Sequence, residues 1–180
     1  LEFRRVLFRS VRRFAAAMAP VFVSNSFSKS FSLYGERVGG LSIVTQSSDE
    51  AARVLSQVKR LVRSNYSNPP TFGGQVVSTV LSTPELRALW EQELGAMRER
   101  IRDMRRQLVE KLKQKIPTMD FSFIMAQRGM FSYSGLPREV VIQLREEHGV
   151  YAVESGRICV AALNSHNIDY VVEAIAKIMR

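Results

Sequence analysis

Cysteine, histidine and long apolar runs are scarce in this sequence, and each scarcity excludes a class of protein. Cys159 is the one cysteine in 180 residues, so the sequence excludes an intrachain disulfide and a multi-cysteine metal site. The two histidines, His148 and His166, have no partner at a metal-ligand spacing. No apolar run approaches the roughly 20 residues of a membrane-spanning helix. We therefore expect a reducing, cytoplasmic setting, no metal and no membrane partner.

The N-terminal stretch is rich in arginine and lacks a long continuous apolar run. Residues 1–10, "LEFRRVLFRS", are too polar for the apolar region of a signal peptide. They fit no pattern that follows, and we interpret them as a cloning or sequencing scar. The net charge of +9 raises nucleic acid as a partner. We give this charge little weight, because five arginines lie within residues 1–13 and the charges of a later helix alternate in sign.

The first part of the chain alternates helices and strands, which is typical of an α/β protein. A helix is expected to end before Pro20. The apolar run "VFVSNS", residues 21–26, predicts a buried strand. The run "RVGGLSIVTQ", residues 37–46, predicts a second strand, in which Gly39 and Gly40 permit close backbone approach.

Three helices are predicted after these strands. Ser47 or Ser48 caps the first, which spans residues 49–66 and has apolar residues at helical spacing. A short helix covers residues 75–82. Thr83 and Pro84 then begin a long amphipathic helix that runs to about residue 115.

The second part of the chain is expected to be α+β. Helices are predicted at residues 137–149 and 167–180, and strands at residues 120–126, 129–135, 150–155 and 157–163. The first two strands are expected to form a hairpin. We place the domain boundary within the long helix, so that one domain spans residues 11–94 and a smaller one spans residues 95–180.

The loop "SNSFSKSFSLYGERVGG", residues 24–40, sets one lysine among small hydroxyl residues. A lysine amine condenses with an aldehyde, and a phosphate needs hydrogen-bond donors and a positive charge. Lys29 supplies the amine, Ser26 and Ser28 supply hydroxyls, and Arg37 supplies a bidentate fork. At the end of a buried strand, Lys29 is expected to be partly desolvated. The pattern by itself also fits a polar loop between two strands.

Several stretches resemble the class I aspartate and aromatic-amino-acid aminotransferases, in the same order. Residues 24–40 resemble the family's cofactor-lysine segment, and the later stretches are "RSNYSNPPTFGGQVV", "LWEQELGAMRERI", "GMFSYSGL" and "REEHGVYAVESGRICVAALN". The wording "SNSFSK" and "LYGERVGGL" is nearest to the bacterial tyrosine (aromatic-amino-acid) branch. The resemblance implies the C-terminal part of a fold-type I transferase: a remnant of the large parallel-sheet domain and a small α+β domain.

The resemblance implies that pyridoxal 5'-phosphate is the cofactor. Lys29 matches the lysine that forms a Schiff base with it and carries the proton of the 1,3-shift. Ser26, Ser28 and Arg37 fall where the family binds or supports the cofactor phosphate, with Ser28 the more distant of the three.

The resemblance also assigns substrate contacts. Arg157 matches the arginine that clamps the substrate α-carboxylate, a role that suits its planar fork. Arg63 matches the arginine that reaches across a dimer to the side-chain carboxylate of a dicarboxylic substrate. Phe131 matches an aromatic residue of the substrate pocket. From the residues alone, these would be a surface arginine, a helix C-terminal cation and a core aromatic.

The sequence departs from the family in length, because intact members are more than twice as long. Their upstream aspartate, tyrosine and stacking aromatic, which contact the cofactor, have no counterpart here. We therefore expect the C-terminal part of an aminotransferase that is inactive alone and forms a homodimer when full length. The expected reaction moves an amino group between an aromatic or dicarboxylic L-amino acid and 2-oxoglutarate. The alternatives are an aspartate-specific enzyme of this family and a basic nucleic-acid-binding module.

Overall fold

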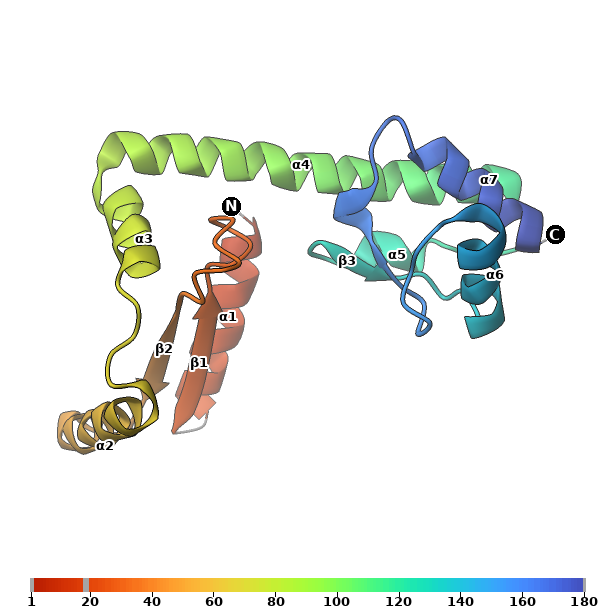
Figure 1. Ribbon diagram of the computed structural model, residues 1–180. Helices are drawn as coiled ribbons and strands as arrows, with labels where there is room; N and C mark the ends of the chain where they lie inside the picture. The colour runs from red at the N-terminus through yellow and green to blue at the C-terminus, as the bar shows by residue number, and fades with distance from the viewer. Residues whose placement is uncertain (1, 18–19, 180) are drawn as a thin grey trace. The chain divides into compact units, whose positions relative to one another are not determined.

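The computed structural model describes residues 2–17 and 20–179 and divides the chain into two compact units (Figure 1). The first unit is Leu1–Trp90 and the second is Glu91–Arg180. Helix α4 (Pro84–Lys115) begins in the first unit and continues into the second. The domain boundary predicted from the sequence lies in this same helix. Among the described residues, no helix is long and apolar enough to cross a bilayer.

The first unit opens with a helix and two strands. Helix α1 (Glu2–Ala17) precedes β1 (Val21–Ser26) and β2 (Gly39–Val44), which form an antiparallel pair. Residues 18–19 lie outside the described residues, so the predicted helix end there is not seen. The pairing sets Ser26 opposite Gly39. The loop with the lysine therefore starts and ends at one end of the strand pair.

Glycine is required at one of two adjacent positions in β2. A Cβ on Gly39 would lie 2.4 Å from the carbonyl oxygen of Asn25, so a side chain does not fit there. A Cβ on Gly40 would meet nothing within 4 Å. The prediction of close backbone approach is therefore confirmed at Gly39 and wrong at Gly40.

Strand β1 is exposed, contrary to the prediction from its apolar pattern. Val21 and Val23 are half-buried, and Phe22 is 66% exposed. Among the described residues, the sheet partner of β1 is β2 alone. A strand that is buried on both faces needs cover on both, and the described residues do not supply it.

Helices α2 (Ser48–Tyr66) and α3 (Phe72–Ser82) follow the strands, as predicted. Ser47 is the N-cap of α2, where its side chain accepts a hydrogen bond from the Glu50 N–H at 3.2 Å. The Glu50 carboxylate accepts one from the Gln46 N–H at 2.8 Å. The Ser47 bond is an N-cap, and the Glu50 bond reaches one residue further back than in a capping box, so both hold the start of the helix. No residue of α2 is buried, so local bonds rather than core packing define it.

The second unit combines short elements with two longer helices. After α4 come α5 (Phe123–Ala126), β3 (Phe131–Tyr133), α6 (Arg138–His148), β4 (Arg157–Cys159), the 3₁₀ helix η1 (Val160–Ala162) and α7 (Ile168–Met179). Strands β3 and β4 form an antiparallel pair. Gly149 follows α6 with a φ of 61°, the left-handed conformation typical of a helix C-terminus, so the helix ends close to its predicted end at residue 149.

Two strands predicted for this unit are wrong. Residues 120–126 contain helix α5, because the N–H and hydroxyl of Ser122 donate to the Asp120 carboxylate and turn the chain. Residues 150–155 form an irregular loop, which is closed by a hydrogen bond from the Gly156 N–H to the Val153 carbonyl oxygen at 2.8 Å. Strand β3 therefore pairs with β4 rather than with residues 120–126.

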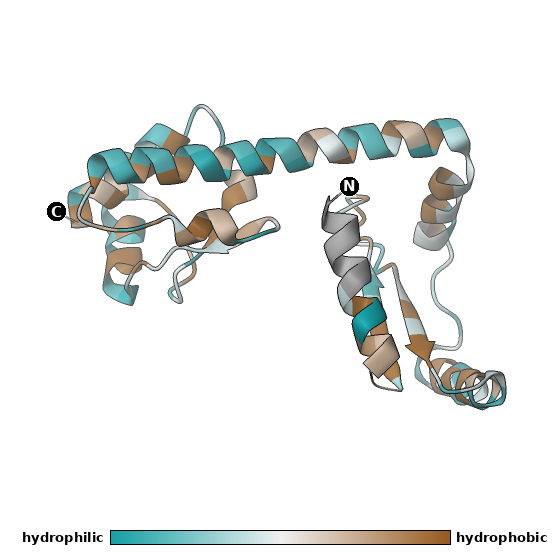
Figure 2. Ribbon diagram, turned by 180° about the vertical axis from the view of Figure 1, so that it is seen from behind, coloured by the Kyte–Doolittle hydropathy of each residue, from teal (hydrophilic) through white to brown (hydrophobic). Residues whose placement is uncertain are grey.

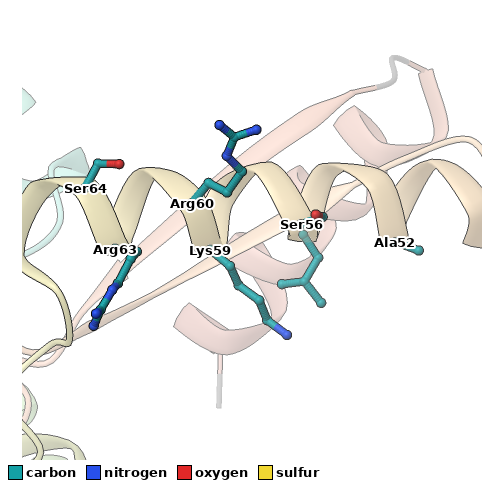
Figure 3. A pocket seen from close by; sticks show the side chains of 7 residues that line it. Ala52, Ser56, Lys59, Arg60, Arg63 and Ser64 are labelled. Atoms are coloured by element: carbon teal, nitrogen blue, oxygen red, sulfur yellow. The ribbon is translucent and has the colours of Figure 1, made fainter.

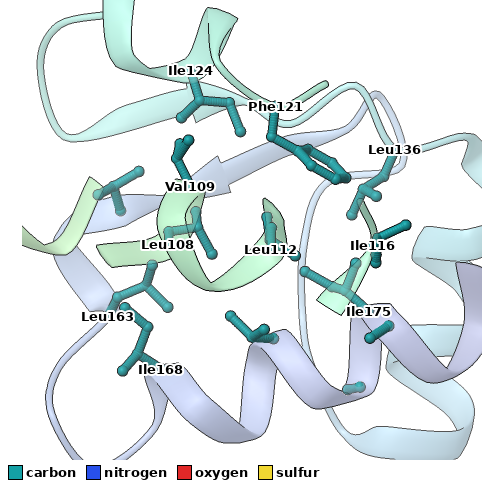
Figure 4. Packing of buried hydrophobic residues seen from close by; sticks show 14 of the residues in the cluster. Leu108, Val109, Leu112, Ile116, Phe121, Ile124, Leu136, Leu163, Ile168 and Ile175 are labelled. Atoms are coloured by element: carbon teal, nitrogen blue, oxygen red, sulfur yellow. The ribbon is translucent and has the colours of Figure 1, made fainter. Parts of the chain in front are cut away.

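The described hydrophobic core lies almost entirely in the second unit. Leu108 and Leu112 on α4 cluster with Ile168 and Ile175 on α7 (Figure 4). Elsewhere α4 is mainly hydrophilic, with scattered apolar residues (Figure 2). This core supports β3 and β4.

Candidate functional site

The lysine loop, residues 27–38, is closed by its own backbone. The Phe27 N–H donates to the Val38 carbonyl oxygen at 3.2 Å, and the Phe31 N–H donates to the Phe27 carbonyl oxygen at 3.1 Å. The Trp90 indole N–H donates to the Ser30 carbonyl oxygen at 2.8 Å. The Trp90 ring also stacks on Phe31, with centroids 4.8 Å apart. These contacts fix the segment that carries Lys29.

Helix α3 approaches the loop closely at a glycine. A Cβ on Gly73 would lie 2.8 Å from the Cβ of Glu36 and 3.3 Å from the Cβ of Val38. Gly73 is buried. The absence of a side chain at Gly73 therefore allows α3 to pack against the end of the lysine loop.

Two of the predicted phosphate ligands contact each other. The Ser26 hydroxyl donates to Ser28 Oγ at 3.1 Å, and the Ser28 backbone N–H donates to Ser26 Oγ at 3.3 Å. Ser28 is buried and Ser26 is exposed. The buried Ser28 thus supports the exposed hydroxyl of Ser26.

Arg37 turns the chain back into β2. Its φ is 53°, a left-handed conformation that is uncommon for a residue with a side chain. Its guanidinium donates to the Tyr34 carbonyl oxygen at 2.9 Å. This bond uses one nitrogen, and no described carboxylate forms an ion pair with Arg37. Its remaining donors are available to an anion.

Lys29 is exposed, which corrects the expectation of partial desolvation. Its position follows β1, and β1 is itself exposed. The Lys29 Nζ lies 3.7 Å from the centroid of the Tyr34 ring, a cation–π contact. Among the described residues, no carboxylate pairs with this amine. The amine is therefore accessible, and Tyr34 restricts where it points.

Arg63 lies in the last turn of α2 and is exposed. Its guanidinium donates to Ser67 Oγ at 2.6 Å, beyond the end of the helix. Lys59 and Arg63 project to the same side of α2, and Arg60 projects to the other (Figure 3). They lie along an open hollow that is lined by Ala52, Leu55, Ser56, Lys59, Arg60, Arg63 and Ser64. The bond to Ser67 fits a helix-terminal cation as well as a substrate ligand.

Arg157 and Phe131 come together on the strand pair of the second unit. Arg157 begins β4 and Phe131 begins β3. The Arg157 Cζ lies 5.0 Å from the centroid of the Phe131 ring, and the ring is 44% exposed. Phe131 is therefore not a core residue. Among the described residues, no carboxylate pairs with Arg157, so its fork is available to a carboxylate ligand.

The predicted site residues thus fall into three places. Ser28, Lys29 and Arg37 lie on the lysine loop, and Ser26 ends β1 directly before it, whereas Arg63 lies at the end of α2 in the same unit. Phe131 and Arg157 share the β3–β4 pair of the second unit.

Sequence reasoning missed the supports of the lysine loop. Trp90 binds the loop backbone, and Tyr34 faces the Lys29 amine. A detectable signal was present: Trp90 is the single tryptophan, and its N–H needs a partner when the ring is half-buried. The partner lies sixty positions away in the sequence, and spacing does not reveal it.

The donors of the lysine loop fit a phosphate group and an aldehyde. Residues 26–37 offer an exposed amine, the Ser26 hydroxyl and an arginine without a described carboxylate partner, all on one short segment. Hydroxyl and guanidinium donors are those that bind phosphate oxygens, and an accessible amine is the group that condenses with an aldehyde.

Comparison with known proteins gives close matches. The family described as "Aminotransferase class I and II" matches residues 2–175. The chain is 64% identical to an aspartate aminotransferase of Pseudomonas aeruginosa and 52% identical to an aromatic-amino-acid aminotransferase of Escherichia coli, each over 94% of this chain and 43% of the relative. A crystal structure of an aromatic-amino-acid aminotransferase from Burkholderia pseudomallei, covalently bound to pyridoxal phosphate, matches 96% of this chain and 43% of that one, with 67% identity and a TM-score of 0.91. The chain thus spans less than half the length of these relatives.

Proposed function

The chain belongs to the class I and II aminotransferase family, and we propose that it carries the lysine and arginines with which such an enzyme binds pyridoxal 5'-phosphate and its substrates. The observation that carries the proposal is the lysine loop. There, the accessible Lys29 amine lies on one segment with the Ser26 hydroxyl and the Arg37 guanidinium, and neither cation has a described carboxylate partner.

The lysine loop and the adjoining Ser26 would hold the cofactor by both its aldehyde and its phosphate. The Lys29 Nζ would take the aldehyde, while Ser26 and Arg37 would bind the phosphate and Ser28 would support Ser26. When bound, pyridoxal phosphate supplies an electron sink for the bond that breaks at the substrate α-carbon. Once the substrate amine has displaced it from the aldehyde carbon, the freed Lys29 Nζ would accept the proton from the substrate α-carbon and return it two atoms away, as in a 1,3-shift. Tyr34, whose ring lies 3.7 Å from this nitrogen, would restrict its direction.

Two arginines would bind the substrate. Arg157 would clamp the α-carboxylate with its fork, over the face of the Phe131 ring. Arg63 would receive the side-chain carboxylate of a dicarboxylic substrate, and it would have to give up its bond to Ser67 to do so. Because an aromatic substrate has no second carboxylate, Arg63 would turn away when such a substrate binds.

The proposed reaction moves the amino group between an aromatic or dicarboxylic L-amino acid and 2-oxoglutarate. Aspartate and aromatic-amino-acid aminotransferases both occur among the relatives, at 64% and 52% identity. An aspartate-specific enzyme is therefore the second candidate, favoured by the relative at 64% identity. Half-reactions of the complete enzyme with aspartate and with tyrosine, each measured without 2-oxoglutarate, distinguish them. Reaction with both amino acids, of which Arg63→Ala impairs only that with aspartate, indicates dual specificity, whereas reaction with aspartate alone indicates the second candidate.

Turnover, dimerisation and location are also proposed. Because the chain spans 43% of the length of these relatives, we propose that transamination requires the rest of that length. We further propose a homodimer, in which Arg63 serves the partner's site, and a cytoplasmic location, which fits a chain with one cysteine. Sedimentation of the complete enzyme tests the dimer.

Labelling of the 180-residue chain tests the cofactor role of Lys29. The chain is equilibrated with less than one equivalent of pyridoxal phosphate, reduced with borohydride and mapped by peptide mass spectrometry. We expect the label mainly on Lys29, because the same loop also binds the phosphate. Pyridoxal, which lacks the phosphate, is expected to show no such preference. Arg37→Ala is expected to remove the preference.

Lys59 provides the matched control, because it is an exposed lysine of the same unit. Lys29→Ala is expected to abolish the preferred labelling, and Lys59→Ala to leave it unchanged. Equal labelling of all lysines by pyridoxal phosphate, with no effect of Arg37→Ala, would refute the proposed cofactor site.

A further inference from the structure

Arg105 is a buried arginine of α4 that has no described carboxylate partner. It is 4% exposed. Its Nε and Nη2 donate to Ser132 Oγ, each at 3.3 Å, and its Nη2 also donates to the Gly129 carbonyl oxygen at 2.6 Å. Burial, and next the charge of Arg128, lower the pKa of Arg105. A buried cation costs free energy that only good hydrogen bonds offset. The hydrogen bonds to Ser132 and Gly129 therefore offset the cost of burying Arg105.

The bonds of Arg105 end on the hidden face of β3. Ser132 is 2% exposed, whereas its neighbours Phe131 and Tyr133 are 44% and 57% exposed. The strand register sets Tyr133 opposite Arg157, so Phe131, Tyr133 and Arg157 share the outer face. Arg105 thus contacts the buried face of β3, and the Phe131–Arg157 contact lies on the exposed face.

A second arginine of α4 binds the chain that follows β4, at the same end of the strand pair. Arg100 donates to the carbonyl oxygens of Ala161 and Leu163, both at 2.8 Å. The Ala161 N–H donates in turn to the Met130 carbonyl oxygen at 3.3 Å. Gly129 precedes β3 and Ala161 follows β4, and the antiparallel register places both at the same end of the strand pair, so the two arginines bind the chain there together. The position of the β3–β4 pair is therefore set by these two arginines of α4.

We propose that Arg105 is a positioning residue for Arg157. It fixes β3 so that the Phe131 ring holds the Arg157 guanidinium in the direction from which it receives a carboxylate. The forked side chain matters, because Nε and Nη2 together bind Ser132 and Gly129, a pattern that the ammonium of lysine does not reproduce. The carboxylate part rests on the proposed function, whereas the placement of Arg157 on the ring does not.

Arginine NMR on the 180-residue chain tests the proposal. The Arg157 Nε–Hε signal is the one that disappears in Arg157→Lys. The change in the chemical shift of this signal in Phe131→Leu measures the contribution of the aromatic ring. Arg105→Met and Ser132→Ala are then compared with the parent chain. We expect both to remove most of the ring-induced shift, and Arg105→Lys to give an intermediate value. Succinate, a dicarboxylate probe, is expected to shift this signal in the parent and to bind about tenfold more weakly in Arg105→Met.

Arg102→Met is the matched control, because Arg102 lies on the same helix, is exposed and pairs with Glu99. It is expected to leave the Arg157 signal unchanged. Thermal melts separate positioning from stability, because Met at a buried cation site can leave stability unchanged. If Arg105→Met does not fold, Ser132→Ala decides. An unchanged ring-induced shift in the folded variants overturns the proposal. No response of the parent to succinate, with the shift still lost in the variants, instead counts against the carboxylate role of Arg157.

Discussion

The two units of this chain differ in how much of their structure is supported by a core. Among the described residues, Val77 is the one buried hydrophobic residue of the first unit, and all the others belong to the second. The first unit presents Lys29 and Arg37 on exposed segments, whereas the second presents Arg157 on a strand pair that α4 holds with two arginines. The candidate site residues Lys29 and Arg37 thus have less structural support than Arg157.

The difference follows from what each unit can bury. The strands of the first unit leave Phe22 66% and Leu41 56% exposed, so they contribute little hydrophobic stabilisation. In the second unit, α4 and α7 bury a continuous cluster, and ion pairs from Lys111 to Asp169 and from Lys115 to Glu173 lie at the surface. Because exposed ion pairs contribute little, the buried cluster carries the stability.

The largest expected effect comes from a cavity in the second unit. Ile124→Ala removes a side chain that is 0% exposed and is expected to lower the free energy of unfolding by about 2–5 kcal/mol. Met125→Ala is the control, since Met125 is 42% exposed, and should have a small effect. Urea titration followed by circular dichroism measures both. Equal effects of the two variants would show that the cluster around Ile124 is not the source of stability.

A smaller effect is expected from a side chain added between β1 and β2. Gly39→Ala places a methyl group 2.4 Å from the Asn25 carbonyl oxygen and is expected to cost about 1–3 kcal/mol of local stability. Gly40→Ala, with nothing within 4 Å, should be nearly neutral. Amide exchange in the two strands measures the difference. Identical exchange rates in the two variants would contradict the close approach at Gly39.

The indole hydrogen bond to the lysine loop is expected to contribute less. Trp90→Phe keeps an aromatic ring on Phe31 but removes the donor to the Ser30 carbonyl oxygen. The expected loss is about 0.5–1.5 kcal/mol, confined to residues 27–38. Leu89→Met, at a position that is 53% exposed, is the control. If exchange in the loop does not respond to Trp90→Phe, the indole does not support the lysine.

The smallest effect concerns pH. The hydrogen bond from Arg138, with smaller contributions from the charges of Arg138 and Arg145, holds the pKa of Glu154 below its ordinary value. A depressed carboxyl pKa stabilises the fold above the pKa of the unfolded group, and this stability is lost as pH falls further, below about pH 4.3. Glu154→Gln should therefore flatten the acid limb of the melting temperature slightly, because these groups are exposed. Glu147→Gln is the control, and the same flattening there would contradict the pairing.

Local signals predicted most of the elements. The capping residue Ser47, the first-turn Pro84 and the stop at Gly149 each act within one helical turn, and all three lie where expected. Predictions that depend on distant partners were less accurate. The burial of β1 depends on neighbours that the described residues do not contain. Residues 120–126 differ for a local reason, because they follow a turn at Asp120 rather than their apolar pattern.

The candidate site shows the same division between local and distant determinants. Lys29 and Arg37 lie on one loop and Ser26 directly precedes it, so the three could be grouped from spacing and resemblance. The contact of Arg157 with Phe131 depends on a strand register between segments 26 positions apart. Nothing in the sequence indicated that Arg105 is buried, because it is one arginine among many on a charged helix.

Hydrogen exchange of the 180-residue chain, read by mass spectrometry for both units at once, tests the central claim most directly. The account predicts strong amide protection in the second half of α4 and in α6 and α7, where the buried cluster lies. It predicts weak protection in β1, β2 and the lysine loop, whose local opening exposes little apolar surface. Equal protection of residues 11–80 and 95–180 would contradict it.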